Sequence, residues 1–416
     1  MKGKNIVLLG AIAMLLAASI PTMALTTTQT SPPATAPSTD WWPTFRHDLQ
    51  HTGNTSSPGP VTNASLWTFD THYFVYSEPA VVNDRMYFGD AKGHVYCLDT
   101  NTGEQLWNYT TGNWVTATPN YYDGKVYFNS EDCYYYCLNA TNGALVWKYN
   151  TSYAYGGYPT VANGKVYFGS SKGYKNNGVI YCLNATDGRM IWNLSVKEFA
   201  FSSPAYLDGN IYIGSSRLIR HIFLFIPVPE YIYCINATTG AIVWKEMTGL
   251  NTWQEPPEMC IANGKLYYAE TSMFGGKLGC LDVSTGAAVW QKTVYRSFNQ
   301  LVFLGIPSIS YGKLYFMVDD FAKEVNEVRC IDAATGSHIW TFKEGCGFPT
   351  CSNGKVYFGT LGQYGSDVNG TVYCLDGNTG AKIWTTPEVN VIAPGSIVNG
   401  RFFVGTLDDN VHCFGS

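Results

Sequence analysis

The sequence predicts an all-β protein, an eight-bladed β-propeller with four-stranded antiparallel blades, and three observations lead to this prediction. One pattern recurs along most of the 416 residues: Tyr-Cys-Leu, then Asp or Asn, then Gly, then Trp. Its cysteines are 40, 45, 52, 46, 50, 44 and 39 residues apart, which leaves room for four short strands per unit. Hydrophobic residues make up 46% and charged residues only 14% of a Tyr- and Gly-rich chain, which is typical of strands joined by tight turns.

The third unit shows how the strands follow one another within a repeat. Pro159 precedes a short first strand, and Asn163-Gly164 forms a tight turn into a second strand of alternating apolar residues. A variable loop leads to the third strand, which ends in Tyr181–Asn184, and a turn leads to a fourth strand that carries Trp192. Four strands per unit without helical periodicity predict a propeller blade.

The two ends of the repeat array determine the number of blades. Seven units carry both the cysteine and the tryptophan, whereas the last unit ends after Val411–Phe414 without a fourth strand. An unmatched Trp67 lies before the first unit, within Ser65–Phe69, and this strand can complete the last blade and close the ring. The eight tryptophans expected to pack blade against blade are Trp67, Trp107, Trp147, Trp192, Trp244, Trp290, Trp340 and Trp384.

The repeat resembles the PQQ-like repeat of quinoprotein dehydrogenases, in which the tryptophan packs each blade on the next. The resemblance covers residues 65–415, and a cysteine stands near the alanine of the family motif. Trp42–Asp48 with His51–Gly53 is similar to a segment that precedes such repeats in secreted prokaryotic proteins. The same propeller occurs in non-enzymatic proteins, such as the outer-membrane barrel-assembly lipoprotein of bacteria. The resemblance therefore implies the fold and leaves an enzyme and a binding scaffold open.

The resemblance also implies what a cofactor site requires. Family dehydrogenases place a disulfide between adjacent cysteines over PQQ, with calcium ligands and an aspartate base around it. The sequence has no adjacent cysteine pair and no haem-binding Cys-x-x-Cys-His motif. We therefore expect no cofactor, and an oxidoreductase that uses PQQ with calcium, or another cofactor, stays as the alternative.

The N-terminal residues predict export. Lys2 and Lys4 precede an uncharged, mostly apolar run, Ile6–Ile20, and Thr22–Ala24 fits a cleavage site, so we expect a signal peptide over residues 1–24. Retention of this segment as an anchor stays open. We expect the protein to be secreted or to lie on the extracellular face of the cell envelope, without a transmembrane span after cleavage.

The rest of the chain divides into three parts. A Thr/Pro/Ser-rich linker over residues 25–40 is followed by a lead-in segment over 41–64 and the propeller over 65–416. The net charge is −5 and no block of Lys and Arg occurs, which argues against nucleic acid as a partner. The expected partner is an envelope protein or a glycan.

Cysteine and histidine are the residues that suggest metal or disulfide chemistry. His47, Asp48 and His51 form a dense group, for which a metal site is conceivable and a capped turn packed under the propeller is preferred. A disulfide between Cys346 and Cys351 stays open. At the repeated cysteine position we expect small buried side chains, because equivalent positions of neighbouring blades lie beyond disulfide reach. These cysteines are Cys97, Cys137, Cys182, Cys234, Cys280, Cys330, Cys374 and Cys413.

Binding residues are expected on one face of the ring. The turns between first and second and between third and fourth strands are tight, whereas the other connections are long and variable, which favours function on the long-loop face. Its inner loops are aromatic, and we expect them to surround the axial opening and bind a protein or glycan, although some could simply plug the channel. They are Tyr73, Phe74, Tyr76, Trp114, Tyr153, Tyr155, Tyr158, Phe199, Phe201, Trp253, Phe298 and Phe348.

Two further surface features carry hypotheses. The loop Leu218–Pro229 is apolar, and its Phe223 and Phe225 either contact a partner or membrane surface or fold down over the blades. Asn-x-Ser/Thr sequons predict glycosylation of the exported chain, although three of them (139, 184 and 236) fall in turns that Asn also favours. They are Asn54, Asn63, Asn108, Asn139, Asn150, Asn184, Asn193, Asn236 and Asn369.

Overall fold

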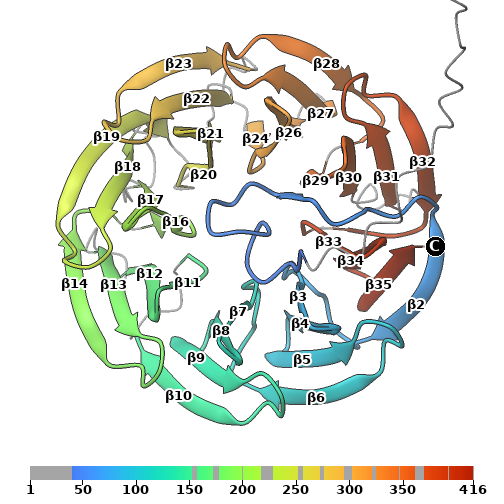
Figure 1. Cartoon of the computed structure of the whole chain (residues 1–416), viewed down its shortest axis with the longest axis horizontal. Helices are drawn as coiled ribbons and strands as arrows, with labels where there is room; N and C mark the ends of the chain where they lie inside the picture. The colour runs from blue at the N-terminus through green and yellow to red at the C-terminus, as the bar shows by residue number, and fades with distance from the viewer. Residues whose placement is uncertain are drawn as a thin grey trace, which may run out of the picture. The chain divides into compact units, whose positions relative to one another are not determined.

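The computed structural model describes residues 40–151, 157–171, 178–198, 200–216, 228–251, 256–271, 276–294, 302–320, 325–345, 347–360, 370–391 and 393–415. The predicted signal peptide and nearly all of the predicted linker lie outside these residues. The described residues form strands, turns and loops, and their sheets make eight blades arranged in a ring (Figure 1). The predicted all-β, eight-bladed propeller is therefore confirmed. Over the part of the chain that is described, no helix has the length and apolar character needed to cross a membrane.

Each blade runs from strand A at the axis to strand D at the rim. Blades 1 to 3 are β3 (Ala80–Val82), β4 (Arg85–Gly89), β5 (His94–Asp99) and β6 (Gln105–Thr110); β7 (Asn120–Tyr122), β8 (Lys125–Ser130), β9 (Tyr134–Asn139) and β10 (Leu145–Asn150); and β11 (Thr160–Ala162), β12 (Lys165–Ser171), β13 (Gly178–Asn184) and β14 (Met190–Val196). In blades 4 and 6 two short segments share the position of strand A. These blades are β15 (Ala200–Phe201), β16 (Ala205–Leu207), β17 (Asn210–Ser216), β18 (Val228–Asn236) and β19 (Ile242–Asn251); and β24 (Val302–Leu304), β25 (Ser308–Ser310), β26 (Lys313–Asp320), β27 (Val325–Asp332) and β28 (His338–Phe342).

The remaining three blades complete the ring. Blade 5 is β20 (Glu258–Ala262), β21 (Lys265–Glu270), β22 (Lys277–Asp282) and β23 (Ala288–Thr293). Blade 7 is β29 (Thr350–Ser352), β30 (Lys355–Gly359), β31 (Thr371–Asp376) and β32 (Lys382–Pro387), with β1 (Asn54–Thr55) added in parallel to β29. Blade 8 is β33 (Ser396–Val398), β34 (Arg401–Gly405) and β35 (Asn410–Gly415), completed by β2 (Ala64–Asp70).

The closure of the ring follows the prediction. β2 pairs antiparallel with β35, and Trp67 lies opposite Cys413, as Trp107 lies opposite Cys97 in blade 1. The last blade is thus built from both ends of the described chain, and β2 covers the edge that β35 would otherwise leave open. We call this place, together with the junction to blade 7, the seam.

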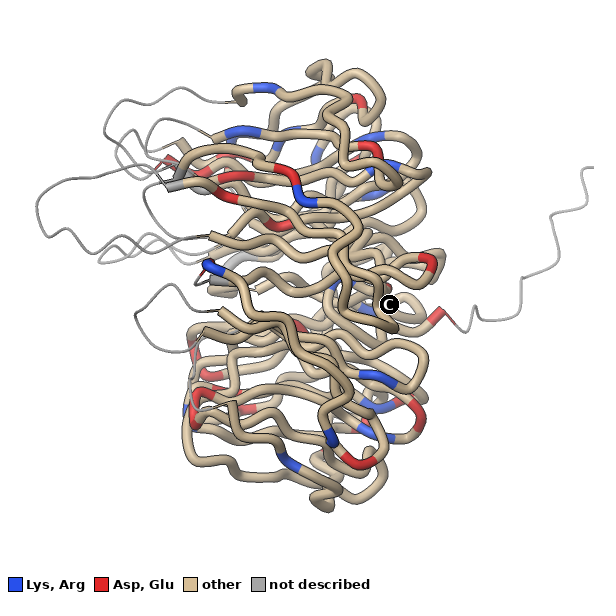
Figure 2. Tube along the Cα trace, turned by 90° about the vertical axis from the view of Figure 1, so that its left-hand side faces the viewer, with Lys and Arg blue, Asp and Glu red and all other residues tan. Residues whose placement is uncertain are grey.

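Two-residue turns join strands A and B within a blade. Asn163 and Gly164 between strands A and B of blade 3 have φ values of 49° and 70°, the left-handed region that Asn and Gly adopt most readily. The A–B and C–D turns lie on one face, called the turn face, and the B–C and D–A connections lie on the long-loop face. Seen from the side, basic and acidic positions are interspersed over the described blades (Figure 2).

Tryptophans on strand D join most blades to the next. The Trp147 Nε1 donates a hydrogen bond of 3.0 Å to the carbonyl oxygen of Ala185 in the C–D turn of blade 3. Its ring lies on Gly188 of that turn, where a Cβ would be only 2.7 Å from the indole, so a side chain there would clash. The equivalent Nε1 bonds run from Trp67 to Thr100, Trp107 to Ala140, Trp192 to Ala237, Trp244 to Val283, Trp290 to Ala333 and Trp340 to Gly377.

The eight repeated cysteines lie between the blades as buried apolar side chains. Each is no more than 1% exposed. Burial raises the pKa of the Cys97 thiol to about 12, so this thiol stays protonated and unreactive at neutral pH. All cysteines among the described residues are free, Cys351 included, and Cys346 lies outside the described residues.

The lead-in segment lies in a different place from the one predicted. It crosses the inside of the ring rather than packing under it (Figure 1). Strand A of most blades has only three residues, and its inward edge presents backbone N–H groups that need acceptors. Carbonyls of the segment supply them, for example from Trp42 to Val81 in blade 1 and from Gly53 to Cys351 in blade 7, at 2.7 and 2.8 Å.

Candidate functional site

Two cavities lie along the axis on opposite sides of the lead-in segment. The first, called the axial pocket, lies on the long-loop face, has a volume of about 590 Å³ and contains Phe45 of the segment in its lining. The second, called the turn-face cavity, has a volume of about 430 Å³ and is lined by the segment together with strand A of blades 2 and 3. The segment therefore separates the predicted binding mouth from the opposite face.

One wall of the axial pocket is an aromatic pair, of which Tyr76 is half-buried and Trp114 is exposed. The rings of Tyr76 and Trp114 stack with centroids 6.4 Å apart and an interplanar angle of 13°. Trp114 is 45% exposed, which is a large apolar surface to leave in water. These two residues come from the D–A connections that enter blades 1 and 2, as the sequence predicted for residues around the axial opening.

The remaining predicted aromatics of the pocket are more deeply placed. Tyr158 packs edge-on against Phe45 with ring centroids 5.1 Å apart. Phe201 also contributes to the lining but is only 6% exposed, and it packs on Gly169 and Gly178 so closely that a Cβ at either would lie 2.3 Å from its ring. Phe201 thus acts mainly as a core residue, the alternative raised for these aromatics from the sequence. Phe348 is a further lining residue.

Some predicted binding residues lie away from the pocket or outside the described residues. Tyr73 and Phe74 are exposed on the same face but do not line the pocket; Tyr73 lies beside His94, with ring centroids 5.9 Å apart. The predictions that fall outside the described residues concern Tyr153, Tyr155, Phe199, Phe223, Phe225, Trp253 and Phe298.

Two acidic residues of the pocket were missed by the sequence reasoning. Glu131 follows strand B of blade 2, its N–H donates to the Trp114 carbonyl at 2.9 Å, and burial raises the pKa of its carboxyl. Glu258 opens strand A of blade 5, and burial together with this carboxyl raises the pKa of Tyr158. Lys, Arg and His are absent from the described lining, so the pocket favours neutral or cationic ligands.

A positional signal in the repeat could have located part of this lining. The residue before the repeat proline differs from unit to unit, and at several units it lines the pocket: Tyr158, Ser203 and Phe348. Glu258 and Ile306 also precede a proline or its replacement. In six blades this proline directly precedes strand A, so the side chains before it gather at a similar height around the axis.

Below the pocket, a buried polar cluster anchors the segment. Arg46 is fully buried; its N–H donates to Glu78 at 2.9 Å, and its guanidinium donates to Ser308 and to the Pro349 carbonyl. Trp42 Nε1 donates to the same carboxyl at 3.1 Å. Burial raises the pKa of Glu78 to about 7, and the nearby Arg46 opposes this shift.

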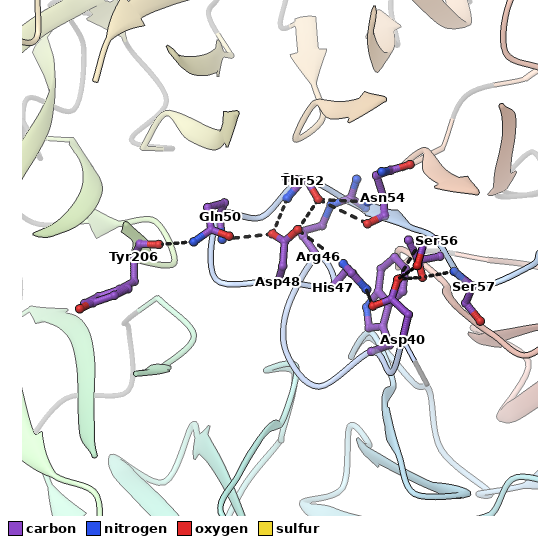
Figure 3. Close-up of polar contacts among 12 residues, drawn as sticks. Asp40, Arg46, His47, Asp48, Gln50, Thr52, Asn54, Ser56, Ser57 and Tyr206 are labelled. Carbon is purple, nitrogen blue, oxygen red and sulfur yellow. Dashed lines mark hydrogen bonds and ion pairs between the residues drawn. The ribbon is translucent and has the colours of Figure 1, made fainter. Parts of the chain in front are cut away.

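The His/Asp group forms a capped turn (Figure 3). His47 lies 3.1 Å from Asp40 and 3.5 Å from Asp48, while Asp48 Oδ1 accepts the N–H groups of Gln50 and Thr52 at 3.1 and 2.9 Å. The His51 N–H donates to the Asp48 carbonyl at 3.0 Å, but its ring forms no hydrogen bond among the described residues, and burial lowers its pKa to about 4. Among the described residues, no group of three or more His, Cys, Asp or Glu side chains could hold a metal ion.

The sequons occupy three kinds of position. Asn63, Asn108, Asn150 and Asn193 are exposed. Asn139, Asn184 and Asn236 use their Oδ1 to accept N–H groups of their own turns, such as Thr186 N–H to Asn184 at 2.7 Å. Asn54 differs because it lies in β1 inside the ring, opposite Cys351, and Asn369 lies outside the described residues.

Comparison with known proteins identifies the family. The family model of the outer membrane protein assembly factor BamB, named PQQ_2, matches residues 58–173, 136–302 and 324–414. The chain belongs to this family of PQQ-like repeat proteins. The predicted resemblance is thereby confirmed.

Three individual proteins are distantly similar to the chain. It is 24% identical to the tetrathionate hydrolase of Acidithiobacillus ferrooxidans over 164 residues, 35% of this chain and only 32% of that protein. Its fold is similar to that of quinohemoprotein alcohol dehydrogenase ADHIIG from Pseudomonas putida HK5 (TM-score 0.70, 16% identity, 90% and 80% of the two chains). BamB from Moraxella catarrhalis gives a TM-score of 0.61 at 15% identity, over 85% of this chain and 98% of that one. These structural similarities show the fold alone.

The PQQ of some family members does not fit the described residues of the axial pocket. PQQ is an anionic quinone that carries carboxylates, whereas the described lining provides Glu131 and Glu258 and no basic side chain. Carboxylates in the lining of a partly desolvated pocket disfavour a ligand that itself carries carboxylates. The described cysteines are free, so none of them forms the disulfide that the family dehydrogenases place over the cofactor.

Proposed function

We propose that this propeller is a binding scaffold, secreted or on the extracellular face of the cell envelope, that binds a protein or glycan at the axial pocket. The observation that carries the proposal is the exposed Trp114, stacked on Tyr76 in the lining of a cavity of about 590 Å³. Rigid aromatic side chains supply large contact areas at low entropic cost and dominate binding hot spots. The volume lies within the usual range for ligand pockets.

The charge of the pocket narrows the chemistry of the ligand. Glu131 lies next to Trp114 in space, because its N–H donates to the tryptophan carbonyl. A neutral sugar ring can stack on the indole and bond to such a carboxylate, and a protein segment can place a polar or basic side chain there. The name of the matching family, outer membrane protein assembly factor, supports a protein partner at the envelope.

The experiment compares two aromatic substitutions on the same face. Trp114→Ala should reduce capture of envelope proteins or binding to a glycan array at least tenfold, with little change in melting temperature because the side chain is 45% exposed. Tyr73→Ala, which removes an exposed aromatic outside the pocket, should leave binding unchanged. Unchanged binding with a lowered melting temperature in Trp114→Ala would contradict the proposal.

Glycosylation and export belong to the same proposal. Intact-mass measurement of the native protein should show loss of residues 1–24 and added glycan mass on exposed sequons such as Asn108 and Asn193. An unmodified mass would exclude glycosylation, and a retained N-terminus would favour the anchor.

A further inference from the structure

The lead-in segment forms the same kind of backbone hydrogen bond with the innermost strands of most blades. In six blades, the backbone N–H of the middle residue of strand A, or of its equivalent, donates to a carbonyl of the segment at 2.6–2.9 Å. The acceptors follow the order of the chain as the segment passes from blade to blade. The pairs are Val81 with Trp42, Tyr121 with Pro43, Tyr206 with Leu49, Ile261 with Gln50, Ile309 with Thr52 and Cys351 with Gly53.

Blades 3 and 8 are left out of this series: among the described residues, neither Val161 of β11 nor Ile397 of β33 donates its N–H to a carbonyl of the segment. The segment leaves blade 2 at Pro43 and reaches blade 4 at Leu49, because the chain turns toward the axis at Arg46 and His47, whose φ values are 56° and 79°. Val161, which lines the turn-face cavity, occupies the position that is paired in those six blades. Among the described residues, no acceptor pairs with its N–H.

The N–H of Val161 points toward the axis. Ala162 and Lys165 close the A–B turn as a paired couple, so Val161, opposite Val166, turns its N–H and C=O away from β12. Val161 is only 4% exposed, and buried backbone groups in folded proteins are paired in the great majority of cases. A partner for this edge must therefore come from within the adjoining space.

That space is the turn-face cavity. Its walls include Val161 itself, Tyr121 and Tyr122 from blade 2, and Thr44 and Leu49 from the lead-in segment. A main-chain edge thus lines one side of a cavity of about 430 Å³, and aromatic and aliphatic side chains line the others. This combination is what recognition by strand addition requires.

We propose that the turn-face cavity binds an extended, uncharged peptide segment of a partner protein, whose main chain pairs with β11 at Val161. The molecule contains the precedent for this pairing. Trp42 forms an isolated antiparallel bridge with Val81, in which N–H and C=O of both residues are used, at 2.8 and 2.7 Å. A partner strand at blade 3 would make the same two bonds.

The side chains of the cavity explain why the segment should be uncharged. The ionisable groups in its lining, Asp40, His47 and Asp48, already bond to one another and to neighbouring residues of the lead-in segment. Lys and Arg are absent from the described lining, so an acidic side chain would find no counter-ion. Small neutral residues pack against the tyrosines without this cost.

The test measures hydrogen exchange at Val161 in the full chain, with acetyl-Ala-Val-Ala-methylamide as the probe. At saturating peptide, the Val161 amide should exchange at least tenfold more slowly, while the Val81 amide, already paired with Trp42, should not change. The same peptide with every amide N-methylated cannot pair and should have no effect. The proposal is overturned if Val161 is unaffected, if both peptides act alike, or if Val161 is as protected as Val81 before any peptide is added.

A pair of tyrosine variants places the effect in the cavity. Tyr122→Ala removes part of the wall and should abolish or reduce the peptide-induced protection at least fivefold. Tyr311→Ala, which removes a 75% exposed tyrosine from the turn of blade 6, should retain it. Equal protection in both variants would place the peptide elsewhere and overturn the proposal. If Tyr122→Ala fails to fold, the comparison of the two peptides on the unchanged protein still decides the matter.

Discussion

The junction between blades 2 and 3 and the junction between blades 7 and 8 use the same residue types, but they are held in different ways. At the first, the Trp147 indole and the Tyr127 hydroxyl both donate to the Ala185 carbonyl, at 3.0 and 3.1 Å. At the second, Trp384 Nε1 is buried without an acceptor among the described residues, and Tyr357 donates instead to the Pro60 carbonyl at 3.1 Å.

The difference has a structural cause. Ala185 belongs to a C–D turn, and blade 8 has no such turn because its strands C and D come from opposite ends of the chain. The lead-in segment supplies an acceptor for the Tyr357 hydroxyl in place of the turn carbonyl, but none among its described residues for the Trp384 indole. In compensation, one continuous cluster of 20 buried residues joins blades 7, 8 and 1 and includes Trp42 of the segment. At the junction of blades 7 and 8, the hydrogen bond of the tryptophan is thus missing among the described residues, and burial of apolar side chains holds the blades together.

The largest test removes the closing strand. Deleting residues 64–70 should open the ring and abolish cooperative unfolding, because β35 would be exposed as an edge and Trp67 would leave the seam cluster. Circular dichroism and thermal melting measure this. A cooperative melt within a few degrees of the intact protein would show that the seam does not need this strand.

Paired tryptophan substitutions compare the junctions directly. Trp147→Phe should destabilise by about 2–3 kcal/mol, since it removes packing and leaves the Ala185 carbonyl with one donor fewer. Trp384→Phe should cost about 1 kcal/mol or less, because it also removes a buried N–H that has no acceptor among the described residues. Denaturant midpoints give both values, and equal costs would show that Trp384 is bonded in solution.

Alkaline pH should weaken the seam selectively. Although burial acts to lower it, hydrogen bonds to Asp40 and Asp48 raise the pKa of His47 from 6.5 to about 9. Protonated His47 therefore contributes its full stabilisation of the folded state below pH 6.5, and this contribution is lost as the pH rises through 9. The loss in the free energy of unfolding should be on the order of 2 kcal/mol after allowance for the partly exposed Asp40.

The seam is affected because Asp40 also accepts bonds from Thr55 and Ser56, and the adjacent Ser57 bonds to blades 7 and 8. Hydrogen exchange at pH 7 and 9.5, corrected for intrinsic rates, should show loosening of blade 8 and not of blade 3. His47→Gln should remove the difference. A uniform response around the ring would argue against a role for this residue in closure.

The smallest expected effect concerns the Pro60 carbonyl, which accepts the hydrogen bond of Tyr357 in place of a turn carbonyl. Tyr357→Phe and Tyr127→Phe should each cost about 1 kcal/mol, because each loses one hydrogen bond from a hydroxyl to a carbonyl oxygen. Equal values would show that Pro60 replaces the turn carbonyl fully. A change near zero in the free energy of unfolding for Tyr357→Phe alone would show that the hydrogen bond to Pro60 does not stabilise the fold.

The sequence was sufficient for the fold because each local signal repeats. The spacing of cysteine and tryptophan, and the unmatched Trp67, were enough to count the blades and to place the closing strand, which pairs with β35 as expected. The prediction of aromatic residues around the axial opening also located Tyr76, Trp114, Tyr158 and Phe348 in one pocket. Both results rest on periodicity, which a single sequence displays.

What the sequence did not predict depends on contacts between residues far apart in the chain. The path of the lead-in segment through the ring follows from unpaired N–H groups of six different blades, and no local pattern reports their convergence. Glu131 and Glu258 have no motif around them, and only the ring brings them to the same pocket. The omission of blade 3, and so the turn-face cavity, depends on backbone turns at Arg46 and His47.

The route of the lead-in segment has a consequence for how the protein is made. Arg46 bonds to Glu78 nearby, but its guanidinium also donates to the carbonyl of Pro349, 303 positions later, and the Ser57 carbonyl accepts from Ser352, 295 positions later. During synthesis these contacts to the last blades can form only when nearly all of the chain is available. Such long-range contacts slow folding and prolong the exposure of apolar surface. Protease resistance of residues 42–60 should therefore appear last during refolding, as the step that marks completion of the ring.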